Sequence, residues 1–326
     1  MNILIMGGTQ FLGRAIVEAA LAAGHTVTLF NRGKTGADLF PQLEKLRGDR
    51  KAGDLAALTG RQFDAVIDVC AFYPRAVREL LETVETAHYT LISTISVYAQ
   101  NDVAGLDESA ELATLTDHTT EEVTGETYGG LKVLCEQAGE AAMPEKTLIV
   151  RSGLIIGPHD PTDRFTYWPV RVARGGTMLL PDAPDYALQV IDARDQAAWI
   201  VQSIEANVTG AFNIAGDSSL TLQAVIDTSQ AISGSDVDRV LVSAETMTAH
   251  EIQPWQEFPL YVPMAGYEGF HRFSIDKALA NGLTFRPIAD TIRDILDWYD
   301  LDQALKIGLK PDREAELIKQ ISTNTA

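Results

Sequence analysis

Residues 1–24, MNILIMGGTQFLGRAIVEAALAAG, decide the fold of this chain. The short apolar run at 2–6 is typical of a buried strand, and residues 11–23 are rich in Ala with apolar positions at helical spacing. Between them lies the turn GGTQFLG at 7–13, whose glycines let the backbone approach a pyrophosphate while the helix N-terminus supplies amide donors. The stretch therefore predicts a strand, a glycine turn and a helix that together bind a dinucleotide.

The rest of the chain alternates short apolar runs with helical stretches. This alternation predicts a parallel sheet with helices on both faces, so the expected fold class is α/β, a Rossmann-type doubly wound parallel sheet. The expected strands are 27–30, 65–69, 90–97, 147–156 and 210–215, the expected helices are 75–85 and 128–142, and 189–205 is either strand or helix.

The texture of the sequence changes after residue 157, where HDPTDRFTYWPVRVARGG is rich in Pro, Gly and aromatic residues. We therefore expect a Rossmann domain from 1–157 and 187–216, and a smaller C-terminal substrate-binding region from 158–186 and 217–326. Four residues of that region are candidates for contacting a substrate, with ordinary packing as the alternative: Arg164, Tyr167, Trp168 and Arg272.

Composition excludes several classes of protein. The 326 residues carry 26 Lys and Arg against 45 Asp and Glu, a formal charge of −19 that would repel a nucleic-acid backbone. Cys70 and Cys135 each lie in an apolar run without a CxxC partner, so we expect reduced core thiols and no metal site. Because uncharged apolar stretches stay shorter than about 18 residues, a membrane span is not expected. These features favour a cytoplasmic protein that acts on a small molecule, with no nucleic-acid or membrane partner.

The end of the second expected strand reads FNRGK at 30–34. A carboxylate near this position holds the ribose 2′-hydroxyl of NAD, whereas the 2′-phosphate of NADP requires a cation. Here the carboxylate is missing, and residues 32–61 hold seven basic and four acidic side chains, a local balance of +3. The expected cofactor is therefore NADP or NAD, with NADP favoured. The alternative is that the basic residues at 47–51 are only a chance surface.

Two further motifs carry the expected chemistry. Tyr128 and Lys132 are four residues apart on an expected helix, so both side chains lie on one face, where the ammonium can lower the pKa of the phenol and hold the cofactor ribose. Thr94 lies in STISVY at 93–98, at the carboxyl end of an expected parallel strand, where ligands bind in open sheets. Such a tyrosine can exchange a proton with an alcohol or ketone while nicotinamide carries the hydride. For Thr94, a hydroxyl that only caps the strand is the alternative.

Taken in this order, the motifs resemble the extended short-chain dehydrogenase/reductases of the NAD-dependent epimerase/dehydratase group, over nearly the whole chain. The stretches 151–158 and 287–299 resemble the family's RxxNVYGP strand and its C-terminal helix, and GGTQFLG with LFNRG is most similar to an atypical branch that includes chloroplast stem-loop RNA-binding proteins. The resemblance implies Thr94, Tyr128 and Lys132 as catalytic residues and Asp49 as the adenine contact. The cofactor-binding residues expected from the motifs and the resemblance are Gly7, Thr9, Gln10, Phe11, Leu12, Gly13, Asn31, Arg32, Lys34, Asp49, Cys70, Ala71, Lys132 and Ile155.

Three positions depart from the family pattern. Gln10 replaces the middle glycine of the turn, which predicts altered cofactor geometry or weaker binding. Asn31 replaces the usual acidic residue and favours NADP or a relaxed preference. Leu154 replaces an asparagine that holds the substrate in the nucleotide-sugar enzymes of the family, which favours a less polar alcohol or ketone.

The expected function is an NAD(P)-dependent oxidoreductase in which Tyr128 is the acid/base and Thr94 polarises the carbonyl. Two alternatives stay open: an NAD-dependent sugar-nucleotide epimerase or dehydratase, and a non-catalytic regulator that senses dinucleotides or associates with RNA. The sequence leaves the substrate, the reaction direction and the oligomeric state open, with a homodimer as the assembly considered.

Overall fold

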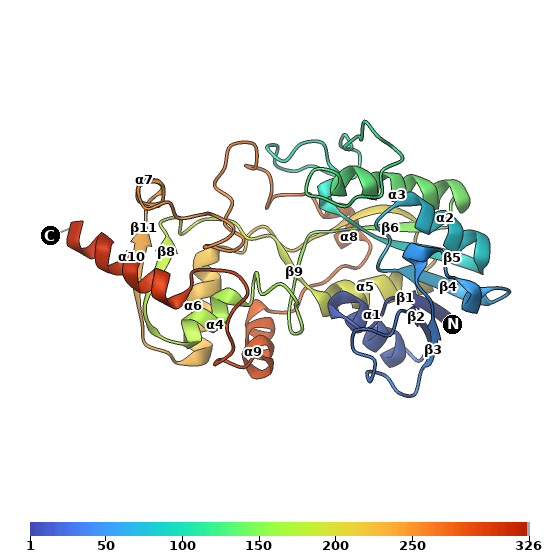
Figure 1. Ribbon diagram of the computed structural model, residues 1–326, viewed down its shortest axis with the longest axis horizontal. Helices are drawn as coiled ribbons and strands as arrows, with labels where there is room; N and C mark the ends of the chain where they lie inside the picture. The colour runs from blue at the N-terminus through green and yellow to red at the C-terminus, as the bar shows by residue number, and fades with distance from the viewer. Residues whose placement is uncertain (325–326) are drawn as a thin grey trace.

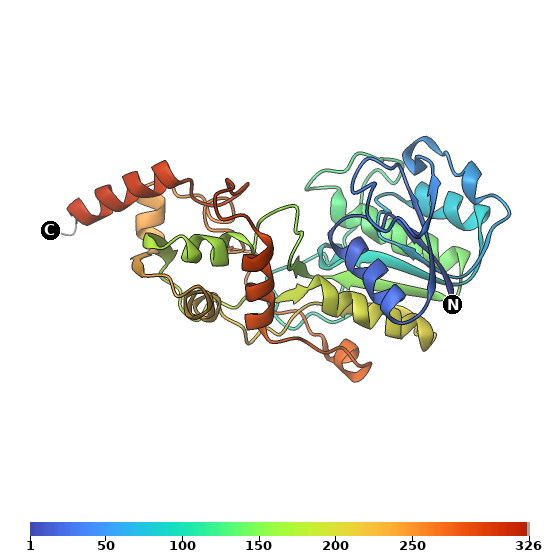
Figure 2. The same cartoon turned by 90° about the horizontal axis from the view of Figure 1, so that it is seen from below.

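The computed structural model describes residues 1–324, with side chains for residues 1–321. The molecule is elongated and has two lobes, with the N-terminus in one and the C-terminus in the other (Figure 1, Figure 2). The N-terminal lobe contains a seven-stranded sheet in the order β10-β6-β5-β4-β1-β2-β3, with every neighbouring pair parallel. Its strands are β1 (Asn2–Met6), β2 (Thr26–Asn31), β3 (Glu44–Arg47), β4 (Gln62–Asp68), β5 (Glu85–Thr94), β6 (Thr147–Ser152) and β10 (Gly210–Ile214).

Helices cover both faces of this sheet (Figure 1). The helices α1 (Phe11–Ala22) and α5 (Ala193–Glu205) lie on one face, and α2 (Pro74–Thr83) and α3 (Tyr128–Ala142) lie on the other. Alternate residues of β1 enter the two cores, Ile3 and Ile5 on the α1 side and Leu4 and Met6 on the α2 side. Burial on both faces explains why the strands read as continuous apolar runs.

The strand order reverses at β1, which lies between β2 and β4. Ligands of open α/β sheets bind at such a switch point, outside the carboxyl ends of the strands. The glycine turn at 7–13 follows β1, and short 3₁₀ turns η1 (Arg50–Ala52), η2 (Ala56–Leu58) and η3 (Ile95–Val97) lie after β3 and β5. The expected cofactor and catalytic motifs are thus gathered at one edge of the sheet. We call this sheet with α1, α2, α3 and α5 the Rossmann lobe.

The C-terminal lobe has its own apolar core, which includes Trp168, Phe258 and Ile292. Its elements are α4 (Tyr167–Ala173), β8 (Gly176–Pro181), α6 (Leu222–Ser233), β11 (Val237–Val242), α7 (Ala244–Ala249), α9 (Ile288–Trp298) and α10 (Pro311–Asn324), with β8 and β11 paired in parallel. The short helix α8 (Asp276–Ala280) instead returns to the Rossmann lobe, where Ala278 and Leu283 join the core beneath α1 and α5. The chain therefore crosses between the lobes more often than the expected boundaries allow.

A two-stranded parallel ribbon connects the lobes, formed by β7 (Leu154–Ile156) and β9 (Val190–Asp192). Leu154 and Ile156 belong to the core of the C-terminal lobe, whereas Ile155 packs against the core of the Rossmann lobe. Because successive side chains of a strand point to opposite faces, the same ribbon contributes side chains to both cores.

The structure corrects three details of the expected elements. The strand β5 ends at Thr94 rather than at residue 97, because the Thr94 side chain accepts a hydrogen bond from the Ser96 amide and starts η3. The expected strand 147–156 is two strands, β6 and β7, separated at Gly153, where a Cβ would lie 2.8 Å from that of Ala215. The basic loop after β2 contains the edge strand β3, which pairs with β2.

Within residues 1–324, the helices are all too short or too polar to cross a bilayer. The same residues contain no group of three or more His, Cys, Asp or Glu side chains placed to hold a metal ion.

Candidate active site

The glycine turn holds the N-terminus of α1 tightly against β1. Gly7 and Gly8 have φ values of 107° and 85°, a region that favours glycine. A Cβ on Gly13 would lie 3.0 Å from the backbone nitrogen of Gly8, so the helix packs directly on the turn. Gln10 is the N-cap residue, and in the described chain its exposed side chain makes no capping hydrogen bond. The first-turn amides are left for an anion, so the pyrophosphate of a dinucleotide fits this end of α1.

The other expected residues of this turn differ in exposure. Thr9 and Phe11 are half-buried, and Phe11 has a φ of 41°, an uncommon value for a residue with a side chain. Leu12 is 5% exposed and its side chain belongs to the core. Leu12 therefore offers a ligand its backbone rather than its side chain.

Asn31 at the end of β2 joins the glycine turn to the edge strand. Its amide nitrogen donates to the Gly7 carbonyl at 3.0 Å, and its oxygen accepts from the Gly33 amide at 2.9 Å and from Arg47. The Arg47 guanidinium also lies against Gly33, where a Cβ would come within 3.0 Å of it. Arg47 thus lies beside Asn31, the residue that replaces the usual acidic one.

Arg47 was not predicted as a site residue, because it belongs to the basic residues at 47–51, whose positive charge could be a chance feature of the surface. The signal that could have found it is strand pairing, because Asn31 and Arg47 are register partners of β2 and β3. The expected cations Arg32 and Lys34 are exposed in the same turn. Three basic side chains, those of Arg32, Lys34 and Arg47, therefore lie at this turn.

The residues after β3 and β4 form a buried polar cluster beside this turn. Asp49 caps η1 by accepting from the Lys51 amide at 3.0 Å. The neighbouring Arg50 makes a two-pronged ion pair with the fully buried Asp68, which also accepts from the Cys70 amide at 3.2 Å. Burial raises the pKa of the Cys70 thiol, so this cysteine is a protonated packing residue at the switch point.

The catalytic helix approaches β5 closely because its second and third residues are glycines. A Cβ on Gly129 would lie 2.1 Å from the Ser96 carbonyl oxygen, and one on Gly130 would lie 2.4 Å from the Leu115 side chain. This close approach brings the half-buried Tyr128 to Thr94, which is 8% exposed. Thr94 is one of the groups that act on the pKa of the Tyr128 hydroxyl, so the two side chains are neighbours. The structure therefore unites Tyr128 and Thr94.

The electrostatics of Tyr128 differ from the expectation. Burial raises the pKa of Tyr128, and the groups that lower it are the neighbouring Thr94 hydroxyl and the charge of Arg164. Lys132, which was expected to lower this pKa, is not among the groups that shift it. The reason is that the Lys132 ammonium lies deeper, where it donates to the carbonyl oxygens of Ala71 at 2.7 Å and Ile92 at 2.6 Å.

Lys132 is 3% exposed, and burial lowers the pKa of its ammonium. Its two carbonyl acceptors lie on neighbouring segments, Ala71 after β4 and Ile92 on β5. Ala71 was expected to contact the cofactor, but it is fully buried and its carbonyl is bound to Lys132. Since an ammonium has three donors, one N–H of Lys132 is left for a ribose hydroxyl.

A second polar network lies beneath the catalytic helix. Glu136, one turn after Lys132, accepts from the Ser93 hydroxyl at 2.5 Å and from Arg151 at 2.8 Å. Arg151 also donates to the Tyr98 hydroxyl at 3.2 Å. The network ties α3 to β5 and β6. It therefore fixes the position of α3, which carries Tyr128 and Lys132, relative to Thr94 at the end of β5.

The four expected substrate residues divide into two groups. Tyr167 and Trp168 are fully buried in the core of the C-terminal lobe, and the Trp168 indole donates to the Pro259 carbonyl at 2.8 Å. Their expected substrate contact is corrected here, because both rings are used in packing α4. Arg164 is half-buried and acts on Tyr128 through its charge, whereas the Arg272 side chain is exposed.

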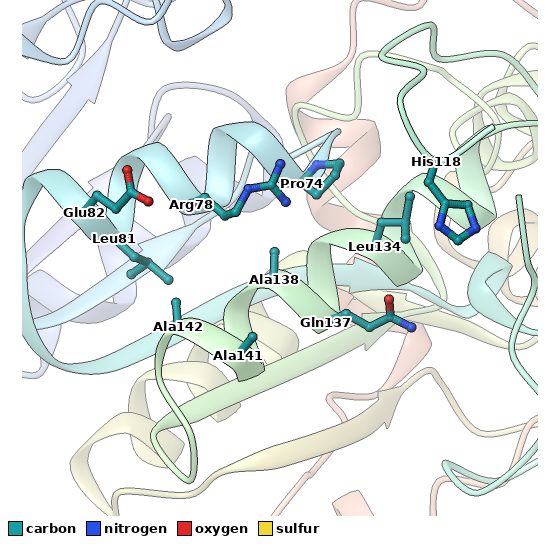
Figure 3. Close-up of a pocket in the computed structure, with 10 residues that line it drawn as sticks. All are labelled: Pro74, Arg78, Leu81, Glu82, His118, Leu134, Gln137, Ala138, Ala141 and Ala142. Carbon is teal, nitrogen blue, oxygen red and sulfur yellow. The ribbon is translucent and has the colours of Figure 1, made fainter.

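A separate groove of about 710 Å³ lies between α2 and α3 on the outer side of the lobe (Figure 3). Figure 3 shows Leu81 from α2 and Leu134 and Ala138 from α3 along it, with Arg78 and Glu82 at its edge. None of the ten residues lining this groove, within the described structure, is one of the expected site residues. The groove is therefore distinct from the candidate active site.

A nucleotide-binding sheet with a Thr, Tyr and Lys set at its carboxyl edge defines a dinucleotide-dependent enzyme of the short-chain dehydrogenase/reductase type. The family model described as "NAD dependent epimerase/dehydratase family" matches residues 3–215. The chain belongs to this family, and it is therefore an NAD(P)-dependent enzyme that uses a nicotinamide dinucleotide.

Solved structures and a curated relative agree with this placement. A human epimerase family protein solved with NADPH has a TM-score of 0.62 and 19% identity, with 91% of this chain and 99% of that chain covered. A UDP-glucuronic acid 4-epimerase from Bacillus cereus solved with NAD has a TM-score of 0.60 and 18% identity, with 94% and 99% covered. Both likenesses show the fold.

The curated relative is the chloroplast stem-loop binding protein of 41 kDa b from Arabidopsis thaliana, which is 33% identical over 118 residues. That match covers 31% of this chain and 31% of the relative, so the two are alike over about a third of their length.

Proposed function

We propose that this chain is an oxidoreductase that interconverts a ketone and an alcohol, with Tyr128 as the acid/base and NADP(H) as the preferred cofactor. The observation that carries the proposal is that Tyr128, at the start of α3, lies beside Thr94 at the carboxyl end of β5, while Lys132 is buried one turn further along the same helix. The bound nicotinamide would supply or accept the hydride.

In the reducing direction, Tyr128 donates its hydroxyl proton to the substrate oxygen. The raised pKa of Tyr128 keeps that proton in place at neutral pH, which suits a proton donor. The Thr94 hydroxyl, positioned by the Ser96 amide at 3.1 Å, donates a hydrogen bond to the same oxygen as negative charge develops. Lys132 holds the ribose through its remaining N–H, and so positions the cofactor rather than the proton.

The preference for NADP(H) rests on the basic side chains at the β2 turn. Arg47 lies beside Asn31, which replaces the usual acidic residue, and Arg32 and Lys34 are exposed in the same turn. A 2′-phosphate placed there would accept charge-assisted hydrogen bonds from a guanidinium.

The test of the proposal is Tyr128→Phe, which removes the proton and keeps the ring. NADPH oxidation is first screened over ketones and aldehydes with the wild-type protein. We then expect Y128F to lower kcat by about 10² to 10⁴-fold while the NADPH Kd, measured by calorimetry, stays unchanged. Tyr267→Phe, at a side chain that is 41% exposed, is the matched control. Turnover by Y128F at the wild-type rate would contradict the proposal.

Two further measurements address the two alternatives. Inversion of an alcohol centre without net consumption of NADPH would identify an epimerase. We propose that nucleic acid is not a partner, because the chain has a charge of −19 and its basic turn is taken by the cofactor. Submicromolar binding of a stem-loop RNA at physiological salt, falling steeply as salt rises, would overturn that part of the proposal.

A further inference from the structure

Arg164 differs from the other partly buried arginines of the molecule. Several of these pair with a carboxylate at 2.5 to 2.8 Å, namely Arg50 with Asp68, Arg151 with Glu136 and Arg171 with Glu314. Arg164 is half-buried, yet among residues 1–324 it forms no ion pair, and its two terminal nitrogens have no hydrogen-bond acceptor. The carboxylate nearest to it along its contacts, that of Asp160, reaches it only through the Thr162 hydroxyl.

The position of this guanidinium is nevertheless fixed on two sides. Its Nε donates to the Thr162 hydroxyl at 3.1 Å, and that hydroxyl donates to the Asp160 carboxylate at 2.7 Å. Asp160 is 2% exposed, so the relay is anchored in the interior. On its face, the guanidinium lies 5.6 Å from the centre of the Trp255 ring. The contacts restrain the Nε edge and one face, and leave the Nη1 and Nη2 edge open.

The charge of this guanidinium reaches the candidate active site. Arg164 lies in the loop after the ribbon strand β7, and its charge acts on the Tyr128 hydroxyl. Since Tyr128 is the proposed proton donor, a substrate whose oxygen reaches Tyr128 also comes within the field of Arg164. The two N–H groups of a guanidinium edge match the two oxygens of a carboxylate or a phosphate.

We propose that Arg164 binds an anionic oxygen group of the substrate, a carboxylate or a phosphate, close to the carbon that exchanges the hydride. The substrate class would be an oxo or hydroxy acid, or a phosphorylated ketone or alcohol, rather than a neutral compound. This inference rests on the proposed function, because it takes Tyr128 as the proton donor. Thr162 and Trp255 are positioning residues that hold the guanidinium.

The kinetic test compares anionic substrates with neutral counterparts. Wild-type protein and Arg164→Met are assayed with NADPH on oxo acids and their methyl esters, and on phosphorylated ketones and the free hydroxyketones. We expect the wild type to prefer one anionic class, and R164M to raise its KM by about 10 to 100-fold with a smaller change in kcat. The increase in KM should be smaller in Arg164→Lys than in R164M, since lysine keeps the positive charge but lacks the two parallel N–H donors of the guanidinium. Arg293→Met removes one exposed positive charge on α9 and is the matched control.

A binding measurement keeps the test independent of turnover. Malonate and inorganic phosphate are titrated by calorimetry into the NADP⁺-loaded wild type, R164M and R293M, so that the 2′-phosphate site is already filled. Binding that R164M loses and R293M keeps supports the proposal, and the probe that binds identifies carboxylate or phosphate. Equal binding by wild type and R164M, or a wild-type preference for neutral substrates that R164M leaves unchanged, overturns it. In the last case Y128F would still abolish turnover, so the proposed function would stand without the anion site.

Discussion

The two lobes hold their site residues by different means. In the Rossmann lobe, Thr94 ends a strand that pairs on both sides, and Lys132 lies within a 15-residue helix. In the C-terminal lobe, Arg164 and Trp255 lie in loops and are held by side-chain contacts. Regular elements fix catalytic atoms more tightly than loops do, whereas loops tolerate change. Under the proposed function, proton transfer would therefore depend on residues held by the sheet, and substrate choice on loops that can vary.

Each lobe also contains a deeply buried ion pair that can be compared with the one in the other lobe. Glu136 and Arg151 join α3, β5 and β6 beneath the catalytic residues. Glu314 accepts hydrogen bonds from Arg171 of α4 at 2.7 Å and from the Leu179 amide of β8 at 3.0 Å. All three residues lie well after Thr94 and Tyr128 in the sequence.

The largest expected effect comes from removing the acidic partner of each pair. Glu136→Ala and Glu314→Ala should each lower the free energy of unfolding by about 3 to 5 kcal/mol, because a buried guanidinium loses its counter-charge. Only E136A should also lower kcat in the folded protein, since only that pair fixes the catalytic helix. Urea unfolding and assays well below the melting temperature separate the two effects. If E136A unfolds, Glu136→Gln serves in its place. Equal kcat for both variants would remove the distinction between the lobes.

The second prediction concerns acid sensitivity in the C-terminal lobe. His271 is 5% exposed, and burial lowers its pKa to about 4, while its ring is hydrogen bonded to the Gln189 amide and the Leu260 carbonyl. The unfolded chain therefore binds a proton that the folded chain excludes between about pH 6.5 and pH 4. The resulting stability is fully present above pH 6.5 and falls as the pH decreases, by roughly 3 kcal/mol at pH 4.

His271→Asn should flatten this dependence, because the amide replaces the imidazole without titrating. Urea midpoints measured from pH 7.5 to pH 4.5 give the slope, and His118→Asn, at an exposed loop position, is the control. A wild-type slope retained in H271N would show that another group makes the protein sensitive to acid.

The third prediction returns to the Rossmann lobe and to the cofactor. Arg47→Met should weaken NADPH binding by about 1 to 3 kcal/mol and leave NADH binding nearly unchanged, since only NADPH carries the 2′-phosphate. Arg32→Asp should weaken NADPH binding within the same range. Calorimetry with both cofactors checks the difference, with R293M as the control. Equal losses for NADPH and NADH in R47M would mean that Arg47 holds the turn rather than the phosphate.

The same division between the lobes explains how much could be predicted from the sequence. The pattern of apolar residues predicted the bounds of β1, α1 and α3 nearly to the residue. Strands buried on both faces and amphipathic helices can be predicted in this way, because their pattern is local in the sequence. The four-residue strand β3, with the sequence EKLR, leaves almost no such pattern, and so Arg47 was missed.

The substrate side was less predictable for a physical reason. Tyr167 and Trp168 begin α4, and only the packing of distant segments such as the chain near Pro259 decides that their rings are core. The raised pKa of Tyr128 was also missed, since it arises from burial of the phenol, while the Lys132 ammonium is bound to the carbonyls of Ala71 and Ile92. These features arise from contacts between residues far apart in the chain, which local periodicity does not contain.

The smallest expected effect lies at the edge of the Rossmann lobe, where β3 carries Arg47. Glu44 at the start of β3 pairs with Arg61, at 3.0 Å for one of the two contacts, and accepts from the Thr28 hydroxyl at 3.1 Å. Both charged side chains are well exposed, at 47% and 37%, so solvent screens the pair. Glu44→Gln should therefore lower the free energy of unfolding by less than about 1 kcal/mol.

The hydrogen bond to Arg61 also lowers the pKa of Glu44, so its contribution is present above about pH 4.5 and is lost as the pH falls through the lowered value. A double-mutant cycle with Arg61→Met isolates the pair energy. NADPH affinity should stay unchanged in E44Q, because β3 is held by its parallel pairing with β2 from Thr28 to Asn31. A loss of NADPH affinity in E44Q as large as that in R47M would mean that a surface ion pair, and not the sheet, positions the Arg47 guanidinium. The contrast between a Rossmann lobe that holds its site residues on regular elements and a C-terminal lobe that holds them on loops would then fail at this edge.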